Sequence, residues 1–167
     1  MAEVTLSMEA MQLIATAEDV ILKQARKQIL REKESGEAGA APNQGQLKIH
    51  IVDIVEEEDK ITFVVEKGQL GLALGKGARN LQTLKSAFNK EVKILEFDED
   101  VERFIRNLFK PHTIESVTME SDEDGMYARV VVKPEDKGKA IGKAGRNINV
   151  VRQLARRHHN IVELKVE

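Results

Sequence analysis

The sequence predicts an α+β protein made of two copies of one small domain. Its 167 residues can hold two small domains in tandem. Shifting the chain by 67 positions aligns residues 74–81 with 141–148, and eight of the 24 residues from 61 to 84 then meet an identical partner. Apolar residues alternate in some runs and recur at helical spacing in others, in the same order in both copies. This period is too long for a solenoid unit and indicates a duplicated domain.

The first copy predicts a β-hairpin, a short helix, a glycine loop, a longer helix and a closing strand. Alternation of apolar and polar residues predicts the two hairpin strands, which the acidic turn at 56–59 joins. Leu81, Leu84 and Phe88 recur at helical spacing and predict the longer helix. The expected strands and helices lie at residues 47–55, 61–65, 69–74, 79–88 and 92–97.

The second copy has the same order and begins with a helix of its own. Phe104, Ile105 and Leu108 belong to one apolar stripe on that helix, and Pro111 ends it. A turn rich in Ser, Asp and Gly at 121–125 joins the next two strands. The expected elements lie at residues 98–109, 113–120, 126–132, 135–141, 146–158 and 161–166, which gives the order αββααβ.

The N-terminal region supplies the leading helix of the first copy. Ser7 and Thr16 are both suitable N-cap residues, and Asp19 after Thr16 resembles a capping box, so helix is expected in one or two pieces as far as about Lys33. Residues 34–46 have almost no bulky apolar side chain, which predicts a mobile linker without a function. We expect one domain at residues 1–97 and the other at 98–167.

Composition excludes several classes of function. There is no apolar run long enough to span a membrane and no basic, apolar leader, so a soluble cytoplasmic protein is expected. The absence of cysteine excludes disulfides, thiol nucleophiles and cysteine-ligated metals. A net charge of -2 counts against nucleic-acid binding. The charge is uneven, however: residues 1–95 carry -1, residues 96–124 carry -7 and residues 126–167 carry +6. The C-terminal quarter is therefore basic.

The glycine loop that the two copies share does not match a nucleotide-binding motif. A Walker A loop has a longer spacing before its Gly-Lys pair and a Ser or Thr after the lysine, but Gly71 stands too close to the pair and Gly77 follows Lys76. The dinucleotide fingerprint needs a glycine where Asn80 stands. The second copy departs in the same ways. We therefore expect no ATP, dinucleotide or other cofactor.

A tight basic turn between two helices suits a phosphate group. Glycine adopts positive φ and lets the backbone of a ligand approach, because it has no Cβ. The helix that follows each loop presents its N-terminal N–H groups and positive dipole. Lys76 and Arg79 add full charges in the first copy, and Lys143 and Arg146 add them in the second. The pattern predicts a clamp for a sugar-phosphate backbone, and its repetition in register disfavours ordinary turn glycines.

At these loops the sequence resembles the KH domain family, whose Gly-X-X-Gly loop grips single-stranded nucleic acid. The αββααβ order resembles the type II arrangement, which implies a three-stranded mixed sheet with helices packed on one face in each domain. Residues 67–77, Lys-Gly-Gln-Leu-Gly-Leu-Ala-Leu-Gly-Lys-Gly, resemble the archaeal NusA-like transcription factors. The predicted RNA-binding residues are Gly75, Lys76, Gly77, Ala78, Arg79, Asn80, Gly142, Lys143, Ala144, Gly145, Arg146, Asn147, Arg152 and Arg156.

The resemblance implies a single-stranded RNA-binding protein of transcription termination or antitermination that is not an enzyme. A KH protein of ribosome assembly or translation fits the same residues, so the RNA is a nascent transcript or ribosomal RNA. RNA polymerase is an implied partner, and we expect a monomer. Ala78 stands where the last glycine of the motif belongs, which predicts that the first loop is stiffer or binds more weakly than the second.

Two further features lie near the second loop. Arg152 and Arg156, one helical turn apart, either extend the phosphate track or form a solvated face. His158 and His159 point ~100° apart on a helix and have no carboxylate or cysteine partner in the pattern, so no metal site is expected. With no Trp and one Tyr in the chain, base stacking is not expected to be the main mode of RNA recognition.

Overall fold

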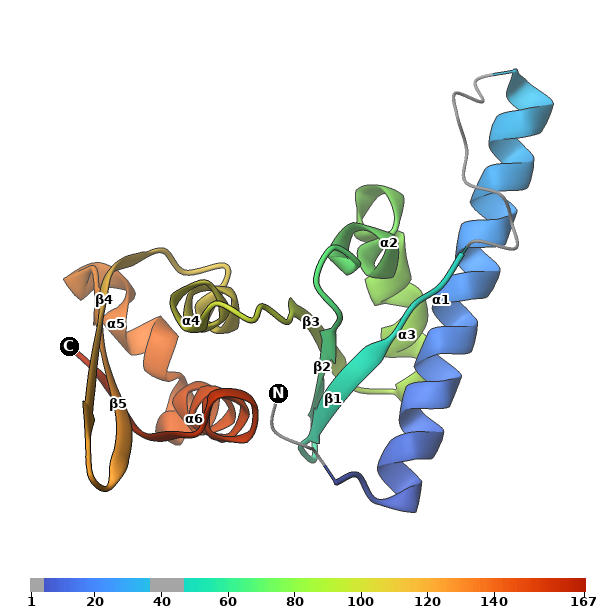
Figure 1. The fold of residues 1–167 in the computed structure, drawn as a ribbon. Helices are drawn as coiled ribbons and strands as arrows, with labels where there is room; N and C mark the ends of the chain where they lie inside the picture. The colour runs from blue at the N-terminus through green and yellow to red at the C-terminus, as the bar shows by residue number, and fades with distance from the viewer. Residues whose placement is uncertain (1–4, 37–46) are drawn as a thin grey trace. The chain divides into compact units, whose positions relative to one another are not determined.

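The computed structural model describes residues 5–36 and 47–167. Within them the chain divides into two compact units, Leu6–Phe97 and Asp98–Glu167. Each unit has the element order αββααβ, with a 3-10 turn between its last two helices (Figure 1). The predicted α+β fold with two copies of this order is therefore confirmed.

The first unit is a three-stranded mixed sheet with its helices on one face (Figure 1). Strand β1 runs antiparallel to the central strand β2, and β3 runs parallel to β2. Parallel neighbours need a crossover, which α2, the loop and α3 provide. The elements are α1 (Met8–Ser35), β1 (Ile51–Glu56), β2 (Lys60–Val65), α2 (Leu70–Leu74), the 3-10 turn (Lys76–Ala78), α3 (Arg79–Phe88) and β3 (Glu91–Glu96).

Helix α1 has a single N-cap. The Ser7 hydroxyl accepts a hydrogen bond from the Ala10 N–H at 3.1 Å. The predicted alternative cap at Thr16 is wrong, because Thr16 lies inside the helix and its hydroxyl donates to the Gln12 carbonyl at 3.0 Å. The helix is therefore one piece.

The C-terminal end of α1 overlaps the predicted mobile segment 34–46. The helix continues to Ser35, and Gly36 closes it in the left-handed conformation at φ 73°. Residues 37–46, where the rest of that prediction falls, lie outside the described residues. No helix in the described part of the chain is long and apolar enough to cross a membrane.

Strand β1 begins later than the sequence predicts, at Ile51 instead of residue 47. The His50 N–H donates to the Gln69 side-chain oxygen at 2.6 Å, and the Ile51 N–H donates to the Glu18 carboxylate at 3.1 Å. Side chains distant in the sequence thus accept bonds that a strand partner would otherwise accept. The pairing of β1 with β2 also has a register shift between Ile51 and Asp53.

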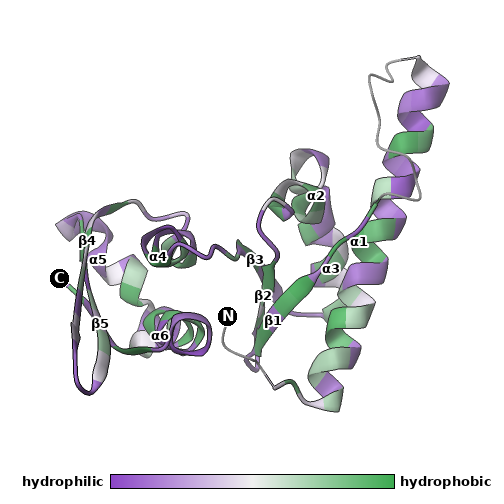
Figure 2. Cartoon of the chain, in the orientation of Figure 1, coloured by the Kyte–Doolittle hydropathy of each residue, from purple (hydrophilic) through white to green (hydrophobic). Residues whose placement is uncertain are grey.

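The core of the first unit lies between α1 and the sheet. Ile14, Ala17 and Ile21 of α1 are buried in one cluster with Phe63 and Val65 of β2. The hydropathy colours show apolar stretches in β1 and β2, in the sheet beside which α1 runs (Figure 2). Full burial of each large apolar side chain stabilises the unit by about 1.5–3 kcal/mol.

The second unit repeats this plan with strand order β4-β5-β6, in which β4 is antiparallel and β6 parallel to β5. At its hairpin turn the Asp122 carboxylate accepts hydrogen bonds from the N–H groups of Asp124 and Gly125 at 2.8 and 3.2 Å. The elements are α4 (Val101–Phe109), β4 (Ile114–Asp122), β5 (Gly125–Val132), α5 (Pro134–Ile141), the 3-10 turn (Lys143–Gly145), α6 (Arg146–His159) and β6 (Ile161–Val166).

Helix α4 fastens the second core. Its N-cap Asp100 accepts a hydrogen bond from the Arg103 N–H at 2.9 Å. Phe104, Ile105 and Leu108 are fully buried, as the apolar stripe predicts. This short amphipathic helix therefore anchors the unit by burial.

Candidate nucleic-acid interface

The first glycine of each loop has a backbone conformation that only glycine adopts readily. Gly75 has φ 73° and ψ 174°, and Gly142 has φ 82° and ψ 168°. A Cβ at Gly75 would lie 2.9 Å from the Asn80 side-chain nitrogen, and a Cβ at Gly142 would lie 2.9 Å from the Asn147 Cβ. Both the torsion angles and the space thus require glycine.

The last two residues of each loop are both left-handed. Gly77 and Ala78 have φ values of 64° and 57°, and Ala144 and Gly145 have 56° and 73°. Each loop therefore carries one alanine in a conformation that costs roughly 1–2 kcal/mol for a residue with a Cβ. The backbone does not distinguish the two loops, and the expected weakness of the first loop stays a prediction.

Two asparagines brace the loops from inside. The Asn80 amide donates to the carbonyls of Ala73 and Leu72 at 3.0 and 3.3 Å, and Asn80 is only 3% exposed. The Asn147 amide donates to the Ala140 carbonyl in the matching place, at 2.6 Å. Each asparagine ties the start of one helix to the end of the previous helix. Burial therefore disfavours the direct RNA contact predicted for Asn80, and both asparagines are assigned a positioning role.

The loops expose positive charge at the start of a helix. Lys76 and Arg79 are exposed beside the N-terminus of α3, and Lys143 and Arg146 are exposed beside that of α6. The N-cap residues are Ala78 and Gly145, and within the described residues neither N-cap has a side-chain hydrogen bond. Two cations and an N-terminus without a side-chain cap suit a phosphate oxygen.

Comparison with known proteins identifies the repeat. A family model described as "KH domain" matches residues 42–111, and one described as "NusA-like second KH domain" matches residues 101–166. A protein of Halobacterium salinarum named "Probable transcription termination protein NusA" is 33% identical over 115 residues, which are 69% of this chain and 82% of the relative. The chain belongs to the NusA-like KH family. We call the unit Leu6–Phe97 the first KH domain and the unit Asp98–Glu167 the second.

Other relatives of this NusA-like protein carry the same name. The relative from Methanococcus vannielii is 32% identical over 117 residues, 70% of this chain and 68% of the relative. The relative from Methanocaldococcus jannaschii is 30% identical over 71% of this chain, and the match spans only 64% of the relative's length. A solved structure titled "Crystal structure of APE1850" has the same fold, with a TM-score of 0.68, 22% identity and coverage of 97% of this chain and 100% of that one. The resemblance inferred from the loops is confirmed.

Arg152 and Arg156 of the second KH domain are placed differently from each other. The Arg152 Nε donates to the Leu164 carbonyl of β6 at 3.0 Å, which ties α6 to the sheet. Arg156 is exposed on the next turn. The Arg156 side chain is therefore accessible for the predicted RNA contact. Arg152 has a structural role at the sheet in addition to its predicted RNA contact.

The two adjacent histidines of the second KH domain both pack against Phe104, with His158 buried and His159 half-buried. The Phe104 ring lies 5.6 Å from the His158 ring and 5.1 Å from the His159 ring, centroid to centroid. The His159 Nε2 lies 2.9 Å from the Asp98 carbonyl oxygen. These contacts give both imidazoles a structural role at the end of α6.

A cavity of ≈ 230 Å³ lies beside the loop of the first KH domain. Gly75, Lys76 and Arg79 line one side of it, and the C-terminal half of α1 lines the other. The sequence reasoning assigned no function to that half of α1. The signal that could have found it is the pair Lys27 and Arg31, one turn apart on one helix face.

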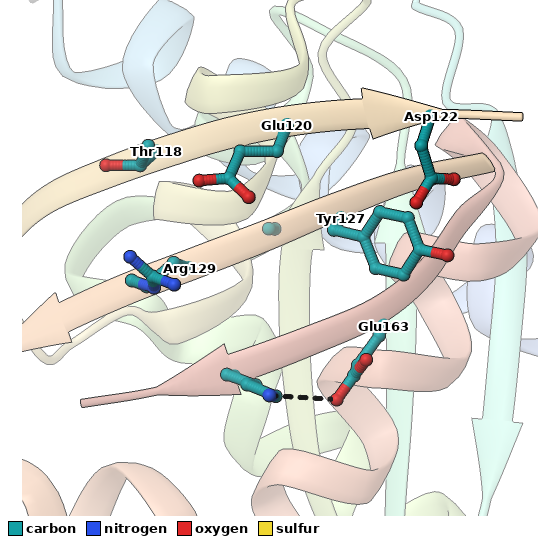
Figure 3. A pocket seen from close by; sticks show the side chains of 8 residues that line it. Thr118, Glu120, Asp122, Tyr127, Arg129 and Glu163 are labelled. Atoms are coloured by element: carbon teal, nitrogen blue, oxygen red, sulfur yellow. Dashed lines mark ion pairs between the residues drawn. The ribbon is translucent and has the colours of Figure 1, made fainter. Parts of the chain in front are cut away.

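A second cavity, of ≈ 210 Å³, lies on the polar face of the second KH domain's sheet (Figure 3). Three carboxylates and two cations line it. The Lys165 Nζ lies 3.5 Å from the Glu163 Oε1. Burial first and the Asp122 charge second raise the pKa of the Tyr127 hydroxyl. Carboxylates repel phosphate, so this face suits an RNA backbone less well than the loops. The lining residues are Thr118, Glu120, Asp122, Tyr127, Ala128, Arg129, Glu163 and Lys165.

Proposed function

We propose that the chain binds single-stranded RNA through both loops and acts in transcription termination or antitermination, without catalysing a reaction. The observation that carries the proposal is the matched pair of loops. Each combines a first glycine that the backbone conformation requires, two exposed cations and a helix start without a side-chain cap. The transcription role is supported by the printed names of the relatives.

The mechanism is a clamp on the sugar-phosphate backbone. Phosphate oxygens accept hydrogen bonds from N–H groups in the first turn of α3 and of α6. Lys76 and Arg79, or Lys143 and Arg146, neutralise the phosphates on either side. Asn80 and Asn147 hold the two helices at the angle that directs these groups outward.

The salt dependence of RNA binding tests the clamp. If the four cations each neutralise one phosphate, the logarithm of the binding constant falls with the logarithm of the salt concentration at a slope of about -3, at ~0.7 per contact. Fluorescence anisotropy with a labelled single-stranded RNA measures this slope. A slope near zero would exclude the clamp.

Loop variants locate the contacts. Lys76→Asp/Gly77→Asp is designed to disable the first loop and Lys143→Asp/Ala144→Asp the second, and circular dichroism checks that each variant stays folded. We expect each to reduce both the affinity and the salt slope. The second-loop variant loses more if Ala78 weakens the first loop. Unchanged binding by the variant with both pairs would refute RNA binding by the loops.

The biological role needs RNA recovered from cells. Crosslinking followed by sequencing compares nascent transcripts with ribosomal RNA, and copurification tests RNA polymerase as the protein partner. Enrichment of nascent transcripts supports the transcription role. Recovery of ribosomal RNA alone would contradict it in favour of ribosome assembly or translation.

A further inference from the structure

Helix α1 extends well past the part that holds it to the sheet. It has 28 residues, against nine in α4 of the second domain. At about 1.5 Å per residue the two helices are about 42 and 14 Å long. The residues of α1 in the central core cluster end at Ile21, so the following turns project beyond the sheet alongside α2 (Figure 1).

The projecting half of α1 faces the clamp loop across the ≈ 230 Å³ cavity. Lys27 and Arg31 of α1 line it together with Lys76 and Arg79 of the loop and α3. Among the described lining residues there is no carboxylate. Four cations around one opening favour an anionic occupant, and two of them belong to the proposed RNA clamp.

Part of the cavity lining is apolar. Ile29 is 6% exposed, and Leu47 and Leu72 are half-buried at the same opening. At about 30 Å³ per molecule in the liquid, the volume equals that of about eight waters, and because bonded atoms pack more closely than separate waters it is large enough for one pyrimidine base. A lining that combines these apolar side chains with four cations therefore fits a nucleotide, with the base against the apolar side chains and the phosphate near the cations.

We propose that the C-terminal half of α1 is part of the RNA site of the first KH domain and binds one nucleotide beyond those held by the loop. This proposal rests on the proposed RNA binding by the loop. Lys27 and Arg31 contact the additional phosphate, and Ile29 and Leu72 contact the base. The nine-residue α4 has no such extension, so the first domain has the longer footprint on RNA.

Paired charge variants test this role in the full chain. The background is Lys143→Asp/Ala144→Asp, so that the first domain supplies the signal. The test variant is Lys27→Gln/Arg31→Gln. The control is Arg26→Gln/Lys33→Gln, which removes the same charge from exposed residues of α1 that do not line the cavity. Glutamine keeps the helix, because its helix propensity is close to that of Lys and Arg.

Labelled oligouridines of two lengths serve as probes. On an RNA of roughly six nucleotides, we expect the test variant to bind about tenfold more weakly, with a salt slope smaller by about 0.7 for the one phosphate contact that is lost, and the control to bind nearly as the background does. On an RNA of roughly four nucleotides, which the loop alone holds, all three should bind alike. This pattern supports the proposal.

Two results would overturn it. If Lys27→Gln/Arg31→Gln matches the control on the longer RNA while Lys76→Asp/Gly77→Asp abolishes binding, α1 has no role and the clamp stands. If uridine monophosphate binds the cavity equally well after Lys76→Asp/Gly77→Asp, the cavity is a mononucleotide site independent of the RNA strand. Loss of the clamp itself is a separate outcome, seen when the loop variants leave RNA binding unchanged.

Discussion

Alanine at two glycines of the second loop should destabilise the second KH domain to very different degrees. Gly142 has φ 82° and ψ 168°, a region essentially limited to glycine, and placing another residue there costs about 1–3 kcal/mol. The new Cβ would also lie 2.9 Å from both the Cβ and the backbone nitrogen of Asn147, which a side-chain rotation cannot relieve. Gly142→Ala should therefore lower the free energy of unfolding by about 3 kcal/mol or more.

The last glycine of the loop should tolerate alanine better. Gly145 is left-handed at φ 73°, and the nearest atom to a new Cβ is Ile148 Cγ2 at 3.8 Å, an ordinary contact. Only the conformational cost remains, so Gly145→Ala should lower the free energy of unfolding by about 1 kcal/mol. Ala144→Gly should raise it by about 0.5–1 kcal/mol, because Ala144 has the same strain at φ 56°.

Tyrosine fluorescence isolates this domain in a urea titration. Tyr127 is the one tyrosine and there is no tryptophan, so the signal reports the second domain. At a slope of about 2 kcal/mol per molar urea, 1 kcal/mol moves the midpoint by about 0.5 M. Gly138→Ala is the control: Gly138 lies within α5 with nothing near a new Cβ, so this change should be stabilising. The reasoning is refuted if Gly142→Ala costs no more than Gly145→Ala.

Three other predictions concern single residues. Burial and the Lys60 charge lower the pKa of Lys93 from 10.5 to about 8. Between these pH values the unfolded chain binds more protons than the folded chain, so the free energy of unfolding rises with pH. Lys93→Met should remove that rise in urea titrations, and an unchanged rise would contradict the prediction. Asn147→Ala should lower the free energy of unfolding of the second domain by about 1–3 kcal/mol, because the Ala140 carbonyl loses its donor; an unchanged urea midpoint would contradict this. Ser7→Ala should destabilise the first domain by about 1 kcal/mol, and Thr16→Ala should stabilise it by a few tenths, in urea titrations followed by circular dichroism; equal effects would place the helix start elsewhere.

Sequence reasoning located the helices and strands of both domains but misplaced some of their ends. Thr16 is a residue type that N-cap positions favour, but the helix already begins after Ser7. Residue type alone does not decide between two such candidates. The start of β1 depends on Glu18 and Gln69, whose side chains accept hydrogen bonds from the backbone at His50 and Ile51. Such partners lie far apart in the sequence, so a local pattern does not reveal them.

Some features of the candidate site can likewise be predicted from the sequence, and others depend on the tertiary structure. The glycines and cations of both loops are visible in the sequence, because the motif is short and is repeated in register. The sequence does not show that Asn80 faces inward, because its burial is set by how α2 meets α3. The sequence also does not show that each loop has one alanine in the left-handed conformation, Ala78 in the first and Ala144 in the second.

The sequence by itself determined the fold class, the family and the two loops, because hydrophobic periodicity, glycine placement and repetition are properties of neighbouring residues. Only the tertiary structure decided that the first loop shares a cavity with the C-terminal half of α1. Lys27 and Arg31 precede Lys76 by more than forty positions and line the same cavity because α1 continues past its core and packs against α2 and α3. That juxtaposition depends on helix length and packing, which place distant side chains around one opening.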